Sequence, residues 1–118
     1  VCADPVADRL VPLIAERMAG LVTGDGRRGS DMGPLVSATH RDKVASYVDA
    51  GASEGARVVV DGREVHPDGD QGGFWLGPTL FDHVETTMTV YTDEIFGPVL
   101  VVIPHDGDDD AVYVCQGV

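Results

Sequence analysis

Residues 98–103 read "PVLVVI", and this uninterrupted apolar run decides the fold class. Four of its six residues are β-branched, which favours a strand. A strand without alternating polar residues is typical of a sheet that is covered on both faces. Helices are the usual cover for such a sheet. The run therefore predicts an α/β fold in which helices pack over a sheet.

A first helix is predicted over residues 5–21, ahead of this strand. Asp4 suits the N-cap and Pro5 suits the first helical position. Pro12 lacks an amide hydrogen, so we expect either a kink or a later start of the helix. The expected buried face consists of apolar residues that recur at helical spacing: Leu10, Leu13, Ile14, Met18 and Leu21.

A second helix is predicted over residues 39–54. Ser37 or Thr39 can cap its first turn, and Gly55 can end it in the left-handed conformation. Its expected buried face consists of Val44, Tyr47, Val48 and Ala52.

Shorter strands are expected after this helix. Residues 57–60 are rich in valine, and Asp61-Gly62 suits a two-residue hairpin turn. The stretch "FWLGPTLFDHV" (74–84) predicts short strands on both sides of Gly77-Pro78. Residues 23–35 and 66–73 are polar and rich in glycine, which indicates loops. The aspartates of residues 106–110 indicate a solvated acidic turn.

Composition excludes several classes of partner. The 118 residues suit one compact domain, and 20 acidic against 8 basic side chains give a net charge of -12. This charge repels nucleic acid and anionic membranes. No segment reaches the roughly 20 apolar residues of a membrane-spanning helix, and no secretory signal opens the sequence. We expect an intracellular, cytoplasmic protein.

Several motifs that suggest chemistry are weak. Gly24, Gly26 and Gly29 match a dinucleotide fingerprint, but they follow a helix rather than a strand. The four histidines show no spacing typical of metal ligands and are interpreted as surface residues. Cys2 and Cys115 lack the surroundings of a catalytic thiolate, and a disulfide between them requires the two ends of the chain to meet. We predict no catalytic residue and no metal site.

Four blocks of sequence carry a more specific signal. They are "DMGPLV" (31–36), "HRDKVASYVDAGASEGARVVVDGR" (40–63), "GFWLGPTLFDHV" (73–84) and "MTVYTDEIFGPVL" (88–100). In this order they resemble the aldehyde dehydrogenase superfamily, and most closely its CoA-acylating methylmalonate-semialdehyde dehydrogenase branch. The resemblance covers roughly residues 8–105. It implies that residues 1–118 form one partial catalytic domain without the Rossmann NAD-binding and oligomerisation regions.

The resemblance also implies two cofactor-binding residues. Glu94 would accept hydrogen bonds from the nicotinamide ribose of NAD, and Phe96 would pack beside that ribose and the nicotinamide ring. A carboxylate can accept from two neighbouring hydroxyls, and an aromatic face can orient the reactive end of the cofactor. The alternatives are that Glu94 caps a turn and that Phe96 fills core space.

The implied reaction is oxidation of an aldehyde, in which a cysteine thiolate adds to the carbonyl and hydride passes to NAD. The resulting thioester would be released to coenzyme A or to water. The motif around the family's nucleophile does not occur in this sequence, so the chain alone is expected to be inactive. The alternative is a free-standing acidic protein-interaction module that keeps only the fold of an enzyme. A domain cut out of a larger enzyme exposes apolar faces that its neighbours cover, so self-association is expected through these faces or through a swapped strand near residues 98–103.

Overall fold

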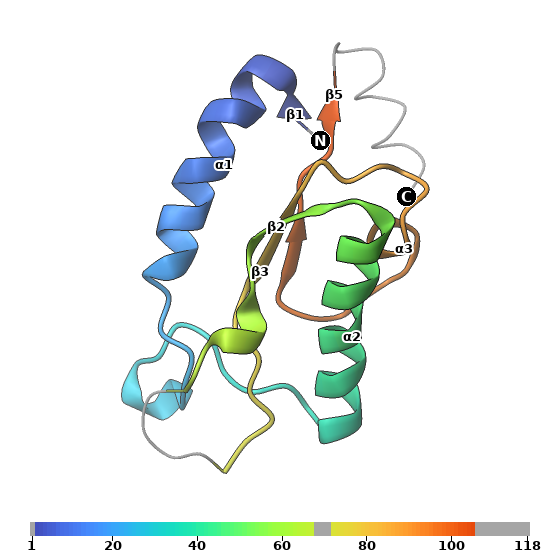
Figure 1. Ribbon diagram of the computed structural model, residues 1–118. Helices are drawn as coiled ribbons and strands as arrows, with labels where there is room; N and C mark the ends of the chain where they lie inside the picture. The colour runs from blue at the N-terminus through green and yellow to red at the C-terminus, as the bar shows by residue number, and fades with distance from the viewer. Residues whose placement is uncertain (1, 68–71, 106–118) are drawn as a thin grey trace.

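The fold is a three-stranded sheet with helices on both faces (Figure 1). The computed structural model describes residues 2–67 and 72–105. The sheet has the order β2-β3-β4, from β2 (Arg57–Val60), β3 (Thr79–Asp82) and β4 (Val99–Val101). Helix α1 (Asp4–Ala19) covers one face, and helices α2 (Ala38–Glu54) and α3 (Thr89–Thr92) cover the other. The predicted α/β class is confirmed.

The remaining elements are short. Strands β1 (Cys2–Ala3) and β5 (Pro104–His105) form a separate parallel pair. Two 3-10 helices, η1 (Gly26–Arg28) and η2 (Gly62–Glu64), lie in the connections. None of the helices in the described part of the chain has the length and apolar character that crossing a membrane requires.

Strand β3 is the centre of the sheet. It pairs antiparallel with β2 and parallel with β4, and all four of its residues are buried. Phe81 belongs to the core under α2, whereas Leu80 packs in a second core under α1. Strand β3 is therefore covered on both faces along its whole length. The strand predicted within residues 98–103 is β4, and this run packs in both cores, through Val101 on one face and Val102 on the other. Strand β4 lies at the edge, where the Leu100 side chain is 45% exposed.

The exposed edge gives a prediction about association. Among the described residues, β4 pairs with β3 alone, so its other edge offers unpaired backbone groups beside Leu100. We expect copies of the chain to associate through this edge, and Leu100→Lys to weaken the association by adding a charge. Light scattering over a concentration series measures the effect, with Ala52→Lys as the control at an exposed position of α2 outside the sheet. A monomer at high concentration would contradict the prediction.

Helix α2 forms where the sequence predicts it, because a capping residue lies at each of its ends. Ser37 caps it by accepting a hydrogen bond from the His40 backbone N–H at 3.1 Å. Gly55 ends it with a φ of 107°. The predicted burial of Val44, Tyr47 and Val48 is confirmed, but Ala52 is exposed. Gly51 faces the core instead, because a Cβ there would lie 2.8 Å from Phe81 Cε1.

Helix α1 differs from its prediction in position and in buried face. It begins at Asp4 and continues through Pro12 to Ala19, so the later start is wrong. Its most buried residues are Ala7 and Val11, and Val11 packs with residues of β3 and of the segment after β4. Of the predicted face, Ile14 and Met18 pack against this core, whereas Leu10, Leu13 and Leu21 are exposed.

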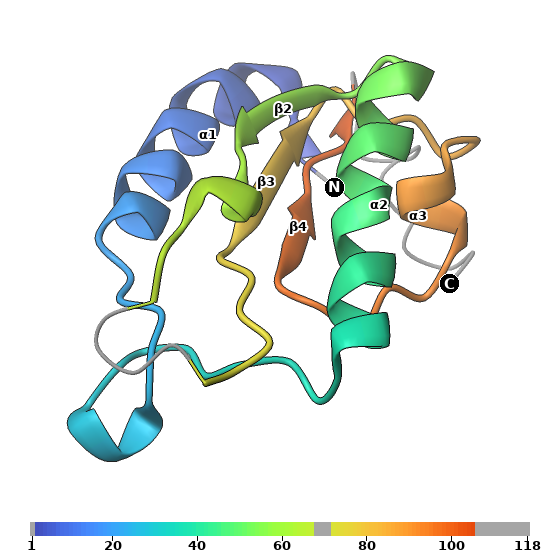
Figure 2. The ribbon, with the colours of Figure 1, turned by 60° about the horizontal axis from the view of Figure 1, so that its bottom comes forward.

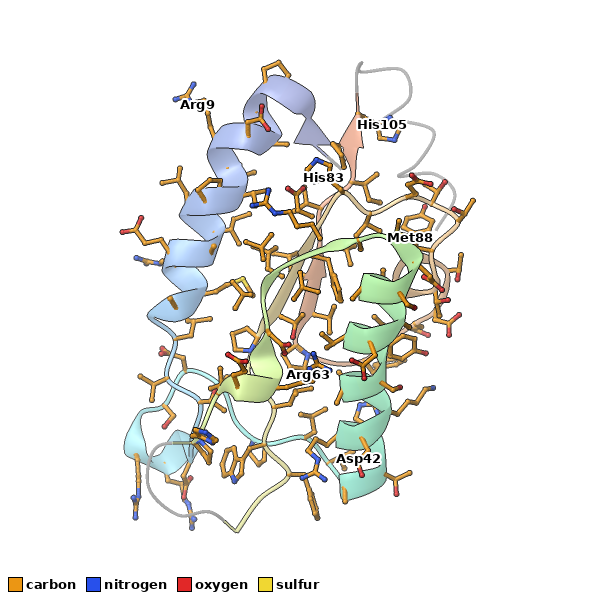
Figure 3. The ribbon with its side chains drawn as sticks, viewed as in Figure 1. Arg9, Asp42, Arg63, His83, Met88 and His105 are labelled. Carbon is orange, nitrogen blue, oxygen red and sulfur yellow. The ribbon has the colours of Figure 1, made fainter. Side chains whose placement is uncertain are left out.

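The predicted hairpin at Asp61-Gly62 is wrong. The Asp61 carboxylate accepts a hydrogen bond from the Arg63 backbone N–H at 3.0 Å and begins the η2 turn. Arg63 also donates to Asp61 and to Asp49 of α2, and Figure 3 shows it between the turn and that helix. Its guanidinium holds the pKa of Asp61 below the ordinary value. Strand β2 pairs with β3 rather than with the residues after the turn.

The region around Gly77-Pro78 is predicted in part. Strand β3 follows the break as expected, but only an isolated bridge between Leu35 and Phe74 precedes it. The acidic turn at residues 106–110, Cys115 and any Cys2–Cys115 disulfide lie outside the described residues, as does the Asp4 side chain that would cap α1.

Candidate functional site

The candidate site is the 93–98 loop, which connects α3 to β4 and contains both predicted cofactor-binding residues. Figure 2 shows this connection passing across the N-terminal half of α2 before it enters β4. Glu94 is exposed, and the Phe96 side chain is 74% exposed. A large aromatic ring at this exposure contributes little to a core, which counts against the space-filling alternative for Phe96.

The Phe96 backbone adopts an uncommon conformation. Its φ is 50°, in the left-handed region that residues with a Cβ rarely occupy. Such a conformation costs on the order of 1–3 kcal/mol and persists only where neighbouring contacts hold it. Residues of this kind gather at binding sites. Three contacts from helix α2 hold the 93–98 loop, and the first of them is to Phe96 itself.

His40 supplies the first of these contacts. Its ring Nε2 lies 2.7 Å from the Phe96 carbonyl oxygen. Because a carbonyl oxygen can only accept, Nε2 carries the hydrogen and donates it. His40 lies in the first turn of α2 and is half-buried, so it lies at the surface as predicted. Its hydrogen bond to Phe96 is what the sequence did not predict.

Tyr47 supplies the second contact, at the other end of the loop. Its buried hydroxyl donates a hydrogen bond to Asp93 Oδ2 at 2.8 Å. This hydrogen bond raises the pKa of Tyr47, because the phenolate form would lose it beside a carboxylate. Asp93 thus fastens the start of the loop to α2.

Close packing supplies the third contact. A Cβ at Gly97 would lie 2.6 Å from Val44 Cγ1, so only glycine lets the loop lie this close to α2. Directly after it, the Pro98 carbonyl accepts a hydrogen bond from the Thr79 N–H at 2.8 Å. The end of the loop is therefore fixed to the central strand as well as to the helix.

A shallow apolar groove of about 480 Å³ lies beside Phe96. Its walls are residues 32–36, His40, Phe96 and Pro98. These residues come from three of the four sequence blocks that carry the family resemblance. The structure therefore brings separate motifs together at the 93–98 loop.

The structure gives no support to the glycine fingerprint or to a metal site within the described residues. Gly24, Gly26 and Gly29 surround the η1 turn between α1 and α2 and open no α-helix, so the fingerprint is a false match. Asp25 caps that turn, and the hydrogen bonds from Arg27 lower its pKa to about 2. His83 lies 3.0 Å from Asp82 Oδ2, a carboxylate contact that the sequence did not predict. Within residues 2–67 and 72–105, no three acidic, histidine or cysteine side chains gather as metal ligands would.

Comparison with known proteins identifies the family. A sequence model of the aldehyde dehydrogenase family matches residues 1–116. The malonate-semialdehyde dehydrogenase of Pseudomonas aeruginosa is 45% identical over 114 residues, which are 95% of this chain and 23% of that protein. The chain thus spans about a quarter of the length of this relative.

Solved structures agree with this result. The methylmalonate-semialdehyde dehydrogenase of Oceanimonas doudoroffii is 38% identical and superposes with a TM-score of 0.89, over 95% of this chain and 23% of that one. An aldehyde dehydrogenase of Mycobacterium tuberculosis complexed with NAD+ is 35% identical, with a TM-score of 0.86 over 96% of this chain and 23% of that one. The chain belongs to the aldehyde dehydrogenase family, and among its relatives are the malonate- and methylmalonate-semialdehyde dehydrogenases.

Proposed function

We propose that this chain is part of the catalytic domain of an NAD-dependent aldehyde dehydrogenase that converts methylmalonate semialdehyde or malonate semialdehyde to an acyl-CoA. The observation that carries the proposal is the exposure of Glu94 and Phe96 on a loop fastened at both ends. The names of the relatives support the substrate class.

The residues of the loop fit the nicotinamide end of the cofactor. The exposed Glu94 carboxylate can accept hydrogen bonds from two ribose hydroxyls, and the exposed Phe96 ring offers an apolar face beside them. When bound, NAD supplies the hydride acceptor for oxidation of the aldehyde. Glu94 and Phe96 would bind and orient it, which contributes to the rate by fixing the reacting groups in the right geometry.

The thiol nucleophile would come from outside these residues. The sequence contains two cysteines, and neither lies in the 93–98 loop or in the walls of the groove beside it. We therefore place this chain in a longer enzyme, in which other segments supply the thiolate and bind the rest of the dinucleotide. The share of the relatives that the chain covers, 23% in both cases, supports this division.

The test is a chimera in which this chain replaces the matching quarter of the Pseudomonas aeruginosa malonate-semialdehyde dehydrogenase. Glu94→Gln keeps the size of the side chain and removes its charge. Hydrogen bonds to a charged group contribute about 1.5–3 kcal/mol, so we expect the KM for NAD to rise by roughly tenfold or more. Steady-state kinetics with malonate semialdehyde measure this change.

Two controls accompany this experiment. Glu85→Gln removes an exposed carboxylate outside the loop and should leave the KM for NAD unchanged. The separate 118-residue chain should show no turnover with the semialdehyde and NAD. The proposal fails if Glu94→Gln behaves like Glu85→Gln in an active chimera, or if the separate chain turns over.

A further inference from the structure

We infer that His40 is a positioning residue for cofactor binding: its Nε2–H holds the Phe96 carbonyl and thereby fixes the conformation in which the 93–98 loop presents Glu94 and Phe96. The inference rests on the proposed function, because it assigns a role toward the same cofactor. His40 itself would not touch the cofactor in this role. It acts on the backbone of a residue that does.

The first argument is that the His40 contact acts on the strained residue itself. Phe96 has a φ of 50°, and its carbonyl oxygen is the group to which His40 Nε2 donates at 2.7 Å. The left-handed conformation of a phenylalanine needs support from its neighbours. A rotation of the Phe96 peptide unit would break this hydrogen bond and turn the ring away from its present direction.

The second argument is that His40 belongs to a rigid element. Its own backbone N–H is bonded to the Ser37 cap at 3.1 Å, and helix α2 is capped at both ends. A positioning side chain is effective when its own backbone is fixed in this way. The donor is thus attached to a helix that is capped at both ends rather than to another loop.

The third argument is that three residues along one face of α2 hold the loop together. His40, Val44 and Tyr47 have the spacing of residues that share a helix face. They contact Phe96, Gly97 and Asp93, respectively. Tyr47 holds the start of the loop, and Val44 sets the distance between Gly97 and the helix. Of these three residues, His40 is the one that bonds to the Phe96 peptide unit. Loss of the His40 donor should therefore change the loop locally and leave the fold intact.

The experiment compares two substitutions in the same chimera. His40→Leu removes the donor and keeps an apolar side chain of similar bulk, whereas His40→Gln keeps an N–H donor on a side chain of similar length. The readouts are the dissociation constants of NAD and of ADP and the melting temperature. ADP lacks the nicotinamide ribose, so its affinity reports the rest of the dinucleotide site.

We expect His40→Leu to weaken NAD binding by about two- to tenfold, the range that loss of a neutral hydrogen bond gives. ADP binding and the melting temperature should stay unchanged, and His40→Gln should restore most of the NAD affinity. If His40→Leu leaves NAD binding unchanged, or weakens NAD and ADP equally, the inference is wrong. A fall in melting temperature with parallel losses for both ligands would indicate a merely structural role.

Glu94→Gln in the same chimera separates the two proposals. If Glu94→Gln weakens NAD binding and His40→Leu does not, only the role of His40 fails. If neither substitution affects NAD binding, the proposed function fails as well.

Should the chimera not fold, nuclear magnetic resonance of the 118-residue chain tests the same contact through the Gly97 amide, which shares a peptide unit with the Phe96 carbonyl. Its chemical shift should change in His40→Leu more than in His40→Gln, and equal shifts would overturn the inference.

Discussion

Phe81→Ala is expected to lower the free energy of unfolding of the chain by about 3–5 kcal/mol. Phe81 lies in the central strand with no exposed surface, and it is the largest of the fully buried side chains in the described part of the chain. Its ring packs against α2 at Gly51, which has no side chain. A Cβ at position 51 would lie only 2.8 Å from Phe81 Cε1. Alanine would leave a cavity between a helix and a strand that cannot close over it, and the lost contacts would not be replaced.

Urea denaturation followed by circular dichroism measures this loss. Phe96→Ala is the matched control, because it removes the same side chain from a position that is 74% exposed. We expect the control to change the free energy of unfolding by less than about 1 kcal/mol. Similar losses for the two substitutions would show that the core does not lie where β3 and α2 meet. Because small domains are stable by only about 5–15 kcal/mol, Phe81→Ala is also expected to lower the yield of folded protein.

Local signals explain which helix the sequence predicts well. Ser37 and Gly55 act within a few residues of the ends of α2, so their effect is visible without knowledge of the fold. The buried face of α1 is different, because it depends on which distant residues pack against it. Leu13 fits the helical period as well as Val11 does, yet Leu13 is 61% exposed and Val11 packs against Leu80. The order of residues alone cannot choose between these two faces.

The same limit explains the wrong hairpin. Asp61-Gly62 does form a turn, as the dipeptide predicts. The partner of β2 is β3, whose four residues are all buried. The turn itself is joined to α2 by the Arg63–Asp49 hydrogen bond. A local signal therefore located the turn, and tertiary packing decided which strand pairs with β2.

The candidate site likewise contains residues that the sequence predicts and residues that only the structure reveals. Glu94 and Phe96 were predicted from their motif, and their role toward NAD remains a prediction. His40 and Tyr47 contact partners that lie 56 and 46 positions away, and no spacing rule connects residues at such a distance. Tyr47 alone carried a usable signal, because a tyrosine on a buried helix face needs a partner for its hydroxyl. Even so, that signal does not identify Asp93 as the partner.

Gly62→Ala is expected to destabilise the chain by about 3 kcal/mol or more, because overpacking against backbone atoms cannot be relieved by a side-chain movement. A Cβ at Gly62 would lie 2.0 Å from the Gly77 carbonyl oxygen. Two hydrogen bonds hold the backbone in this place: the Gly77 N–H donates to the Gly62 carbonyl at 2.9 Å, and the Gly62 N–H donates to Thr79 Oγ1 at 3.0 Å. The substitution would separate the η2 turn from the residues that lead into β3.

Gly26→Ala is the matched control for this substitution. A Cβ at Gly26 meets no atom within 4 Å, and its φ is not in the left-handed region. Alanine there should be neutral or should stabilise the chain by up to about 1 kcal/mol, since it restricts the unfolded state. Thermal and urea unfolding of both variants measure the difference. If Gly62→Ala and Gly26→Ala unfold alike, the two backbones do not meet at Gly77, and the connection between β2 and β3 must follow another path.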